Sequence, residues 1–358
     1  MQTAFFAMGN QITIFDVARL AGVSKGTVDR VLHNRGEVSS ATEKKVREAI
    51  EELNYTTNVY ASNLGFHGSR TFSFILPTSA DGEYWHKLSN GAAIASSRLA
   101  PMNAIVKTYY FDQYDPSSFV RTCNEVLSAG PSGVVMVPLF LKEAAVFASE
   151  LTSRSIPYAC IDTKPDDAGY LAYYGMDKYN SGVLCAALLT ERLEVSEVKR
   201  VLIVRILRDM KGKSDPTAER RSGFSDFMCR EFPDCVTDTV FINPSDSSDV
   251  KNVLETYFSE HPDVKLVVMF NSRVYLLGDY FLAHPDSGRR VVAFDDLDGN
   301  FDLLRKGGVT ILICQRTEDQ AVRSVAALAD SVLMHSQPSK RDNYVHMEIL
   351  TRYNIDNY

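Results

Sequence analysis

Residues 13 to 32 have the pattern of two short helices joined by a tight turn: Thr13-Ile14-Phe15-Asp16-Val17-Ala18-Arg19-Leu20-Ala21-Gly22-Val23-Ser24-Lys25-Gly26-Thr27-Val28-Asp29-Arg30-Val31-Leu32. Val17, Ala18 and Ala21 fall on one side of the first helix at helical spacing. Gly22 permits the turn that lets two short helices cross steeply. Ser24 is placed to cap the second helix by accepting a hydrogen bond from an N–H of its first turn. The stretch therefore predicts a helix–turn–helix.

The second of these helices has an inward edge and a projecting edge. Val28, Val31 and Leu32 are expected to anchor it inward. The residues left outside are Lys25, Gly26, Asp29, Arg30 and His33. A helix held by its back edge, with its N-terminal residues projecting, has the geometry that enters a DNA major groove. The other interpretation is a plain helical hairpin with a polar face, which the turn and the cap alone do not exclude.

A third helix is expected to follow. It begins at Ser40, where Ser40 and Glu43 have the spacing of a capping box. Its buried stripe consists of Val46, Ala49, Ile50 and Leu53. This third helix favours a three-helix head over a plain hairpin.

The three helices together resemble the DNA-binding head of the lactose-repressor (LacI/GalR) family of bacterial transcription regulators. The stretches in register with that family are Asp16-Val17-Ala18, Ala21-Gly22-Val23-Ser24, Thr27-Val28, Arg30-Val31-Leu32 and Asn54-Tyr55. The resemblance implies a helix-turn-helix DNA-binding domain over residues 12–57 and a hinge helix and linker over 58–70. It further implies a periplasmic-binding-protein-like effector-binding and dimerisation domain over 71–358.

The resemblance also implies which residues contact DNA: Thr13, Ser24, Lys25, Gly26, Thr27, Asp29, Arg30, His33, Arg35, Asn58, Ala61 and Leu64. Lys25, Gly26 and Arg30 would occupy base-reading positions, and an arginine there is able to reach guanine, the commonest specific contact. Gly26 has no side chain, so we expect weak discrimination at its position. Asp29 stands where the family usually has a small hydroxyl residue. It would either accept a hydrogen bond from cytosine or restrain Arg30, and the sequence leaves both open.

The segment from Asn58 to Leu64 would, by the same resemblance, form a hinge helix only on operator DNA. Leu64 would insert into the minor groove at the centre of the site. Such an insertion unstacks a base step at a cost of roughly a few kcal/mol, which added contacts must offset.

Composition places the chain among globular proteins with a sizeable core. It has 358 residues, of which 45% are hydrophobic and 23% charged, so two or three structural units are expected. The formal net charge is −7, and residues 12–66 hold seven basic and seven acidic side chains. DNA affinity must therefore come from the distribution of charge, with Lys25, Arg30 and Arg35 on one face.

The cysteines show no metal-ligand spacing, and most of the six lie inside apolar runs: Cys123, Cys160, Cys185, Cys229, Cys235 and Cys314. Buried, reduced thiols and a cytoplasmic location are expected. The first residues lack the features of an export signal, and no segment approaches the roughly 20 apolar residues that span a bilayer. We expect no metal, no cofactor and no membrane association.

After residue 70 short apolar runs alternate with amphipathic stretches. The expected strands are 71–76, 104–109, 133–137, 158–161, 172–174, 200–206, 236–241, 266–270, 291–294 and 309–313. The expected helices include 119–129, 142–153, 181–193, 223–231, 248–261 and 318–335. Near-continuous apolar strands alternating with helices predict parallel sheets covered on both faces. So many strands favour an α/β fold of two doubly wound lobes.

Polar side chains follow several of these strands, where ligands bind in sheets of this kind. The candidate effector contacts are Tyr84, Trp85, Asp162, Arg220, Asn271, Asp295 and Gln315. Taken singly, each fits ordinary turn chemistry. Trp85, the one tryptophan, is either an ordinary core residue or an effector contact, and its polar, loop-like surroundings favour the contact. Together they supply acceptors for hydroxyl groups, donors from arginine and amides, and aromatic faces for C–H groups. A polyhydroxylated ring requires that combination.

The core motifs resemble the sugar-binding branch of the periplasmic-binding-protein superfamily and its repressor relatives. The matching stretches are Arg220-Arg221-Ser222-Gly223-Phe224, the loop at Asn271, Val291-Val292-Ala293-Phe294-Asp295-Asp296 and Cys314-Gln315. The resemblance implies two lobes that exchange strands and hold a sugar or sugar derivative between them through the seven candidate residues. Thr163-Lys164 after Asp162 and Gly82-Glu83 before Tyr84 depart from the usual pattern, which leaves the identity of the sugar open.

The sequence therefore predicts a homodimeric, sequence-specific transcriptional regulator, expected to be a repressor, that reads a near-palindromic DNA operator and is controlled by a small-molecule effector. Whether the effector releases or promotes DNA binding is left open. The alternative is a non-catalytic sugar-binding receptor with a vestigial head. A sugar-processing enzyme is a third class. Because the chain offers no phosphate-loop spacing and no supported Ser/His/Asp or Cys/His set, we assign no catalytic residue and expect no enzyme.

Overall fold

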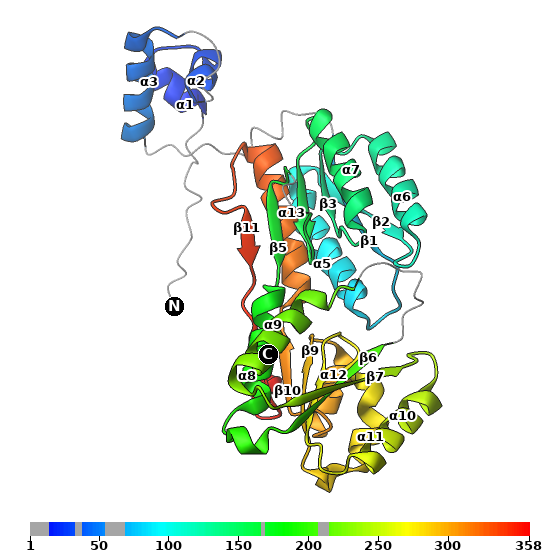
Figure 1. Ribbon diagram of the computed structural model, residues 1–358. Coiled ribbons are helices and arrows are strands. Elements are labelled where there is room, and N and C mark those ends of the chain that lie inside the picture. Colours follow the sequence, from blue (N-terminus) through cyan, green and yellow to red (C-terminus); the bar gives the residue numbers. More distant parts are fainter. Residues whose placement is uncertain (1–13, 33–37, 54–68, 166–168, 207–214) are drawn as a thin grey trace, which may run out of the picture. The chain divides into compact units, whose positions relative to one another are not determined.

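The computed structural model describes residues 14–32, 38–53, 69–165, 169–206 and 215–358 (Figure 1). The chain forms two compact units, which divide between residues 67 and 68. The first is called the head unit and the second the core unit. None of the helices within the described ranges is long and apolar enough to cross a membrane.

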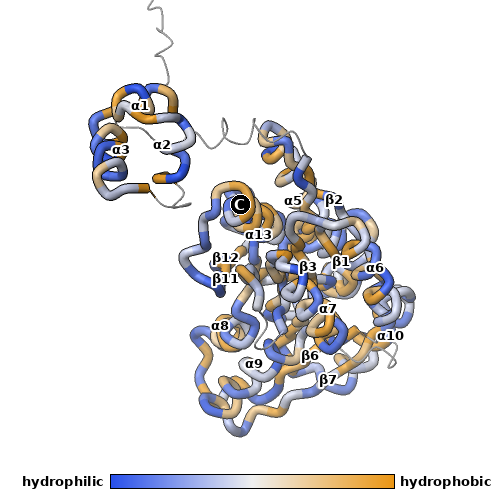
Figure 2. Tube along the Cα trace, turned by 90° about the horizontal axis from the view of Figure 1, so that it is seen from above, coloured by the Kyte–Doolittle hydropathy of each residue, from blue (hydrophilic) through white to orange (hydrophobic). Residues whose placement is uncertain are grey.

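The head unit contains three helices, α1 (Ile14–Ala21), α2 (Lys25–Leu32) and α3 (Ser40–Glu52). Their buried side chains are those that helical spacing predicted to point inward, among them Val17, Val28 and Val46. In Figure 2 hydrophobic and hydrophilic residues alternate along these helices, as expected when one face of each is buried. The predicted three-helix head is confirmed.

The turn between α1 and α2 has the predicted chemistry. Gly22 has a φ of 67°, in the left-handed region that a residue with a side chain rarely adopts. The Oγ of Ser24 accepts a hydrogen bond from the backbone N–H of Thr27 at 3.2 Å. Ser24 therefore caps α2, as the sequence predicts.

The predicted capping box of α3 is wrong. The helix begins at Ser40 as expected, but the residue that caps it is Ser39, whose Oγ accepts from the backbone N–H of Thr42 at 3.3 Å. Since Ser40 already lies inside the helix, its side chain is not placed to cap the first turn. Glu43 instead accepts from Arg47, one turn further along, at 2.7 Å.

The first lobe of the core unit is a six-stranded parallel sheet in the order β11-β5-β4-β3-β1-β2. Its strands are β1 (Arg70–Pro77), β2 (Ala104–Phe111), β3 (Gly133–Met136), β4 (Tyr158–Ile161), β5 (Ala172–Gly175) and β11 (Asp342–Tyr344). The helices on its two faces are α5 (Tyr84–Leu99), α6 (Pro116–Ala129), α7 (Leu141–Ser153) and α13 (Thr317–Met334).

The second lobe is a six-stranded sheet in the order β12-β10-β9-β8-β6-β7, parallel except for β12. Its strands are β6 (Arg200–Ile206), β7 (Val236–Ile242), β8 (Leu266–Met269), β9 (Arg290–Phe294), β10 (Ile311–Cys314) and β12 (Glu348–Leu350). Its helices are α8 (Lys178–Thr190), α9 (Ala218–Glu231), α10 (Ser247–Glu260), α11 (Gly278–Ala283) and α12 (Asp298–Arg305). Short 3-10 helices cover Ala100–Met102, Val195–Glu197, Val274–Leu277, Pro285–Ser287 and Ile355–Asn357.

The chain crosses between the lobes at three places. Strand β5 of the first lobe leads into α8 of the second, and β10 of the second lobe leads into α13 of the first. The third crossing joins β11 to β12. The first two crossings are at residues 176–177 and 315–316, beside the carboxyl ends of the sheets, so they bring polar groups of both lobes to one place.

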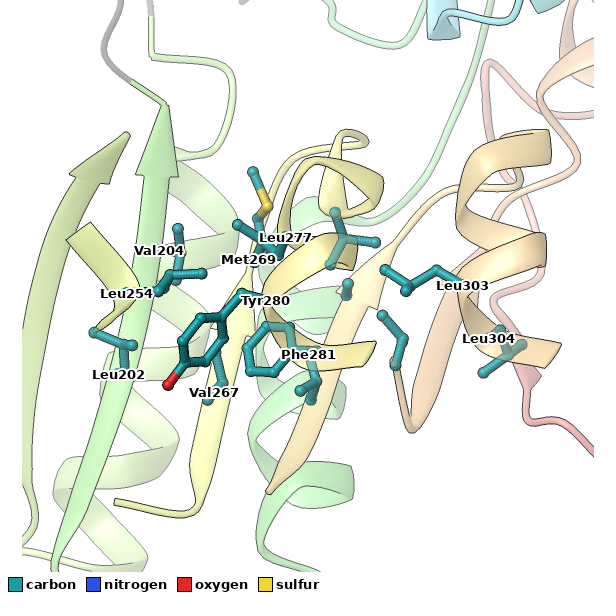
Figure 3. Packing of buried hydrophobic residues seen from close by; sticks show 14 of the residues in the cluster. Leu202, Val204, Leu254, Val267, Met269, Leu277, Tyr280, Phe281, Leu303 and Leu304 are labelled. Atoms are coloured by element: carbon teal, nitrogen blue, oxygen red, sulfur yellow. The ribbon is translucent and has the colours of Figure 1, made fainter. Parts of the chain in front are cut away.

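Each lobe has apolar clusters on both faces of its sheet, as near-continuous apolar strands require. Figure 3 shows one of them in the second lobe, where Leu202, Val204, Val267 and Met269 of the sheet meet Tyr280 of α11. These clusters fix the strand ends, and with them the loops that carry the candidate site.

The predicted α/β fold with two doubly wound lobes is confirmed. Every predicted strand is present, with ends that agree to within two residues, and the six predicted helices are present with shifted ends. Helix α9 begins at Ala218 rather than at residue 223. The α-helices and strands of the core unit that were not named from the sequence are α5, α11, α12, β11 and β12.

Candidate functional site

A pocket lies between the two lobes of the core unit, at the carboxyl ends of β4, β8, β9 and β10. Its lining includes all seven candidates from the sequence: Tyr84, Trp85, Asp162, Arg220, Asn271, Asp295 and Gln315. The structure thus brings the set together, and contact with an effector stays a prediction. The lining also includes residues that the sequence analysis did not name, among them Glu83, Lys178, Thr217, Ser272 and Arg273.

Asp162 organises the first-lobe side of the pocket. It follows β4 with a left-handed φ of 64°, which a short polar side chain tolerates. Its carboxylate accepts from the Tyr84 hydroxyl at 2.9 Å, from Lys178 Nζ at 3.2 Å and from Thr163 Oγ1 at 3.0 Å. Burial by itself would raise the pKa of Asp162, but Lys178 and Arg220 hold that pKa below its ordinary value. The carboxylate is therefore ionised and largely occupied by protein donors.

Tyr84 and Trp85 belong to the first turn of α5, so the loop-like surroundings expected for Trp85 are wrong. Burial and the nearby Asp162 raise the pKa of Tyr84 well above its ordinary value, which keeps its hydroxyl a proton donor. The two rings meet edge to face, with centroids 4.9 Å apart. Trp85 is partly buried against the first-lobe core and also lines the pocket, and its contact with an effector stays a prediction.

Arg220 lies in the first turn of α9 and is 5% exposed. Its Nη1 donates to the carbonyl oxygen of Phe270 at 2.9 Å, and its Nη2 to the sulfur of Met176 at 3.6 Å. The guanidinium lies 4.4 Å from the ring centroid of Phe294. Its Nε has no hydrogen-bond partner among the described residues. Arg220 is thus a buried cation without a directly bonded carboxylate in the part of the chain that the structure describes.

Two glycines allow α8 and α9 to approach closely enough to place Arg220. A Cβ atom on Gly182 would collide with the carbonyl oxygen of Arg220, and one on Gly223 with that of Tyr179. The packing of these helices therefore requires glycine at both positions, and it sets how far Arg220 extends into the pocket.

Asp295 and Gln315 form the second-lobe side. Asp295 follows β9 with a φ of 74°, and its Oδ1 accepts from Gln315 Nε2 at 2.7 Å. The same amide nitrogen donates to the Tyr84 hydroxyl at 3.1 Å, which links the two lobes. Gln320 donates to the carbonyl oxygen of Gln315 at 2.8 Å and to its Oε1 at 3.2 Å. The orientation of the Gln315 amide is therefore fixed.

Burial raises the pKa of Asp295 to about 6, and the neighbouring carboxylates of Asp296 and Asp162 add to the rise. Arg220 and the hydrogen bond from Gln315 act in the other direction. Asp295 is therefore the carboxyl group of the pocket whose charge responds to mildly acidic pH.

The loop after β8 supplies Asn271. Its Oδ1 accepts from the backbone N–H of Arg273 at 2.8 Å, which leaves its amide N–H groups free of partners among the described residues. Asn300, a buried residue that the sequence analysis did not name, braces this loop. Its Nδ2 donates to the carbonyl oxygen of Ser272 at 2.8 Å and to that of Asp295 at 3.1 Å.

Several groups of the pocket have no protein partner among the described residues and are available to a ligand. The Nε of Arg220 and the amide nitrogen of Asn271 are donors, the second carboxylate oxygen of Asp295 is an acceptor, and Trp85 adds an aromatic surface. A molecule with several hydroxyl groups matches this set, because each hydroxyl both donates and accepts.

Lys178 is a pocket residue that was not predicted, although the sequence carries a signal for it. It stands just after β5, at the carboxyl end of a strand, where the other candidates were found. Lys164, which follows Asp162 more closely in the sequence, pairs instead with Asp342 and lies 5.0 Å from the ring centroid of Tyr173. Proximity in the chain therefore points to the wrong lysine.

The head unit presents a second candidate surface. Of the predicted DNA contacts that the structure describes, Ser24, Lys25, Gly26 and Arg30 are exposed, while Thr27 and Asp29 are partly exposed. Their contact with DNA stays a prediction. The remaining candidates lie outside the described residues: Thr13, His33, Arg35, Asn58, Ala61 and Leu64.

Two family models match the chain. The one described as bacterial regulatory proteins, lacI family, matches residues 13–58, and the one described as periplasmic binding protein domain matches residues 72–334. A solved structure described as a LacI transcriptional regulator from Bacteroides fragilis superposes with a TM-score of 0.75 and 30% identity, over 81% of this chain and 100% of that one.

Two relatives show the same likeness in sequence. The HTH-type transcriptional regulator MalR of Streptococcus pneumoniae is 37% identical over 92 residues, which are 26% of this chain and 28% of MalR. Catabolite control protein A of Staphylococcus xylosus is 29% identical over 158 residues, which are 44% of this chain and 46% of that protein. The matched stretches span less than half the length of these two relatives. With a lacI-type head followed by a periplasmic-binding-protein core, the chain belongs to the lacI family of bacterial regulatory proteins.

Proposed function

We propose that this chain is a DNA-binding transcriptional regulator whose operator affinity is set by a sugar or sugar derivative bound between the lobes of the core unit. The observation that carries the proposal is the presence, in one chain, of an α2 helix with an exposed first turn and of a pocket rich in buried polar groups. Coupling between the two sites is what makes such a chain a regulator, and thermodynamics requires that coupling to be reciprocal.

The exposed edge of α2 supports a role in reading DNA. Val28 and Val31 bury the back of the helix, while Lys25, Gly26 and Arg30 remain exposed at its other edge. An arginine in this position makes bidentate hydrogen bonds to guanine in a major groove. Two roles remain for Asp29, acceptance from cytosine or restraint of Arg30.

The pocket supports a sugar as the effector class. Arg220 and Asn271 donate, Asp295 accepts, and the rings of Tyr84 and Trp85 lie at the same wall. A polyhydroxylated ring uses all of these groups at once, whereas an apolar ligand would leave the Nε of Arg220 and the second carboxylate oxygen of Asp295 without partners.

The edges of the two sheets support a homodimer on a near-palindromic operator. Strands β2 and β7 are the outermost strands at corresponding ends of the two sheet orders. Exposed apolar side chains lie along them, Ile105 and Tyr110 on β2 and Val236 and Phe241 on β7. Exposed apolar edges favour pairing with another chain. A second copy would cover them and bring two heads to two half-sites.

DNA binding is tested by fluorescence anisotropy with a labelled duplex from the region upstream of the gene. We expect binding that exceeds binding to a scrambled duplex, and Arg30→Ala should weaken it by about 1–3 kcal/mol, roughly 5- to 150-fold. The matched control is Arg47→Ala, which removes an exposed arginine of α3 and should change binding far less. A receptor with a vestigial head would instead show no duplex preference and no effect of Arg30→Ala.

A further inference from the structure

The first turn of α5, in the first lobe, makes polar contacts with the second lobe at three places. Glu83 pairs with Arg273 at 2.6 Å, and Lys87 pairs with Asp296 at 3.6 Å. Between them in the chain, the Tyr84 hydroxyl accepts from Gln315 at 3.1 Å. All three contacts are made by the protein's own side chains, so they join the lobes directly.

The pair of Glu83 and Arg273 is well placed to act as a clamp. Both side chains line the pocket and are about one quarter exposed, at 23% and 24%. Glu83 is the N-cap residue of α5, yet its side chain makes no capping hydrogen bond and extends to the other lobe. Arg273 is tied to its own lobe by its backbone N–H, which donates to Asn271 at 2.8 Å. Each member of the pair is therefore anchored on its own lobe.

Glu83 and Lys87 also have the spacing and order that favour an ion pair within one helix, with glutamate four residues before lysine. The backbone N–H of Lys87 donates to the carbonyl oxygen of Glu83, so the two residues are one helical turn apart. Each nevertheless pairs with an opposite charge on the second lobe. Glu83 and Lys87 could pair with each other, yet both pair with residues of the second lobe. This face of α5 therefore stabilises the contact between the lobes.

The second ion pair is buried more deeply than the first. The side chains of Lys87 and Asp296 are 18% and 6% exposed. Asp296 also accepts from Thr317 at 2.8 Å and from the Tyr358 hydroxyl at 3.3 Å, and it stands next to the pocket residue Asp295 in the chain. The ion pair of Lys87 and Asp296 therefore also holds the segment that positions Asp295 in the pocket.

We propose that Glu83 and Arg273 are positioning residues of the pocket. Their ion pair, supported by that of Lys87 and Asp296, stabilises the closed arrangement of the two lobes. It thereby keeps Asp162 and Tyr84 of the first lobe opposite Arg220 and Asp295 of the second.

The chain carries its own probe for this proposal, because Trp85 is the one tryptophan and lines the pocket beside Glu83. Lobe opening exposes its ring to solvent. The experiment measures quenching of Trp85 fluorescence by acrylamide, a neutral quencher, in the full-length protein without ligand. Circular dichroism confirms that each variant is folded. Because neither DNA nor a sugar is present, the result does not depend on the proposed function.

The variants are Glu83→Gln, Arg273→Gln and the charge exchange Glu83→Arg with Arg273→Glu. We expect each single variant to raise the quenching constant about twofold or more, since a partly exposed ion pair shifts an opening equilibrium by a factor of that order. Added salt should raise quenching in the natural protein and have less effect in the single variants. The charge exchange should return quenching to near the natural value.

The matched control is Glu150→Gln, which breaks the 2.7 Å ion pair with Arg154 at the C-terminal end of α7 in the first lobe. It should leave Trp85 quenching unchanged. The proposal is overturned if Arg273→Gln, a change on the lobe that does not carry Trp85, leaves quenching unchanged. It is also overturned if the charge exchange is as readily quenched as the single variants, because the residues would then act only as local structure.

Discussion

Two aspartates of the pocket show how far neighbours decide the chemistry of a side chain. Asp162 accepts hydrogen bonds from Lys178 and Tyr84 and stays ionised. Asp295 has one side-chain partner among the described residues, Gln315, and burial brings its pKa to about 6. Both positions could be predicted as polar residues after strands. Their difference could not, because it depends on Lys178, which the crossing from β5 to α8 brings to Asp162.

The raised pKa of Asp295 predicts a pH dependence of stability. The ordinary pKa of an aspartate is 3.8 and that of Asp295 is about 6, so between these values the folded state binds more protons than the unfolded state. This residue therefore lowers the free energy of unfolding as pH rises from about 4 to about 6. Asp295→Asn removes that dependence. Urea unfolding between those pH values should show the variant gaining stability relative to the natural protein as pH rises.

The control for this pH experiment is Asp302→Asn, which changes an exposed aspartate of α12. Its difference from the natural protein should vary much less across the same range. A stability difference for Asp295→Asn that is constant with pH would show that burial does not perturb this carboxyl group.

Arg220 gives a second prediction at the level of one residue. Monosaccharides are screened for those that raise the melting temperature of the natural protein. For such a sugar, Arg220→Ala should abolish the shift in melting temperature, because the variant lacks the buried guanidinium that donates hydrogen bonds to the sugar. Arg230→Ala, which removes an exposed arginine from the same helix, should retain the shift. A full shift in the Arg220 variant would remove this residue from the site.

Among the elements, α5 shows why part of the fold escaped prediction. Gly91 interrupts its helical pattern, and glycine weakens the local preference for a helix. A Cβ atom at that position would collide with the carbonyl oxygen of Glu318 at the start of α13. The packing of α5 against α13 therefore requires glycine at position 91, and that glycine weakens the helical pattern of α5 in the sequence. Strands β11 and β12 were missed for another reason, since three residues each are too few to show an alternating pattern.

The packing of α8 against α9 predicts a large effect of a small substitution. In Gly182→Ala the new methyl group would collide with the carbonyl oxygen of Arg220, so the helices must separate. We expect a loss of about 1–3 kcal/mol in unfolding free energy, or somewhat more. Gly26→Ala is the control, because that helical position has space for a methyl group and alanine favours a helix. Equal stability of the Gly182 variant and the natural protein would contradict the close approach.

For the whole molecule, the exposed edges of β2 and β7 predict a dimer. Ile105 is 48% exposed and Phe241 is 45% exposed. Replacing both by glutamate should raise the dimer dissociation constant by at least tenfold in sedimentation measurements, since charge at an apolar interface opposes association. Val146→Glu, at a 72% exposed position on α7 and on neither edge strand, should leave association unchanged. A double variant that associates like the natural protein would place any interface elsewhere.

The central claim is that the pocket and the head are coupled, and reciprocity gives its most direct test. Titration calorimetry measures the dissociation constant of a bound sugar with and without saturating operator duplex. Anisotropy measures that of the duplex with and without saturating sugar. We predict that both constants change by the same factor, about 5- to 150-fold, as typical coupling free energies give. Two constants that each stay the same when the other ligand is present would contradict the account.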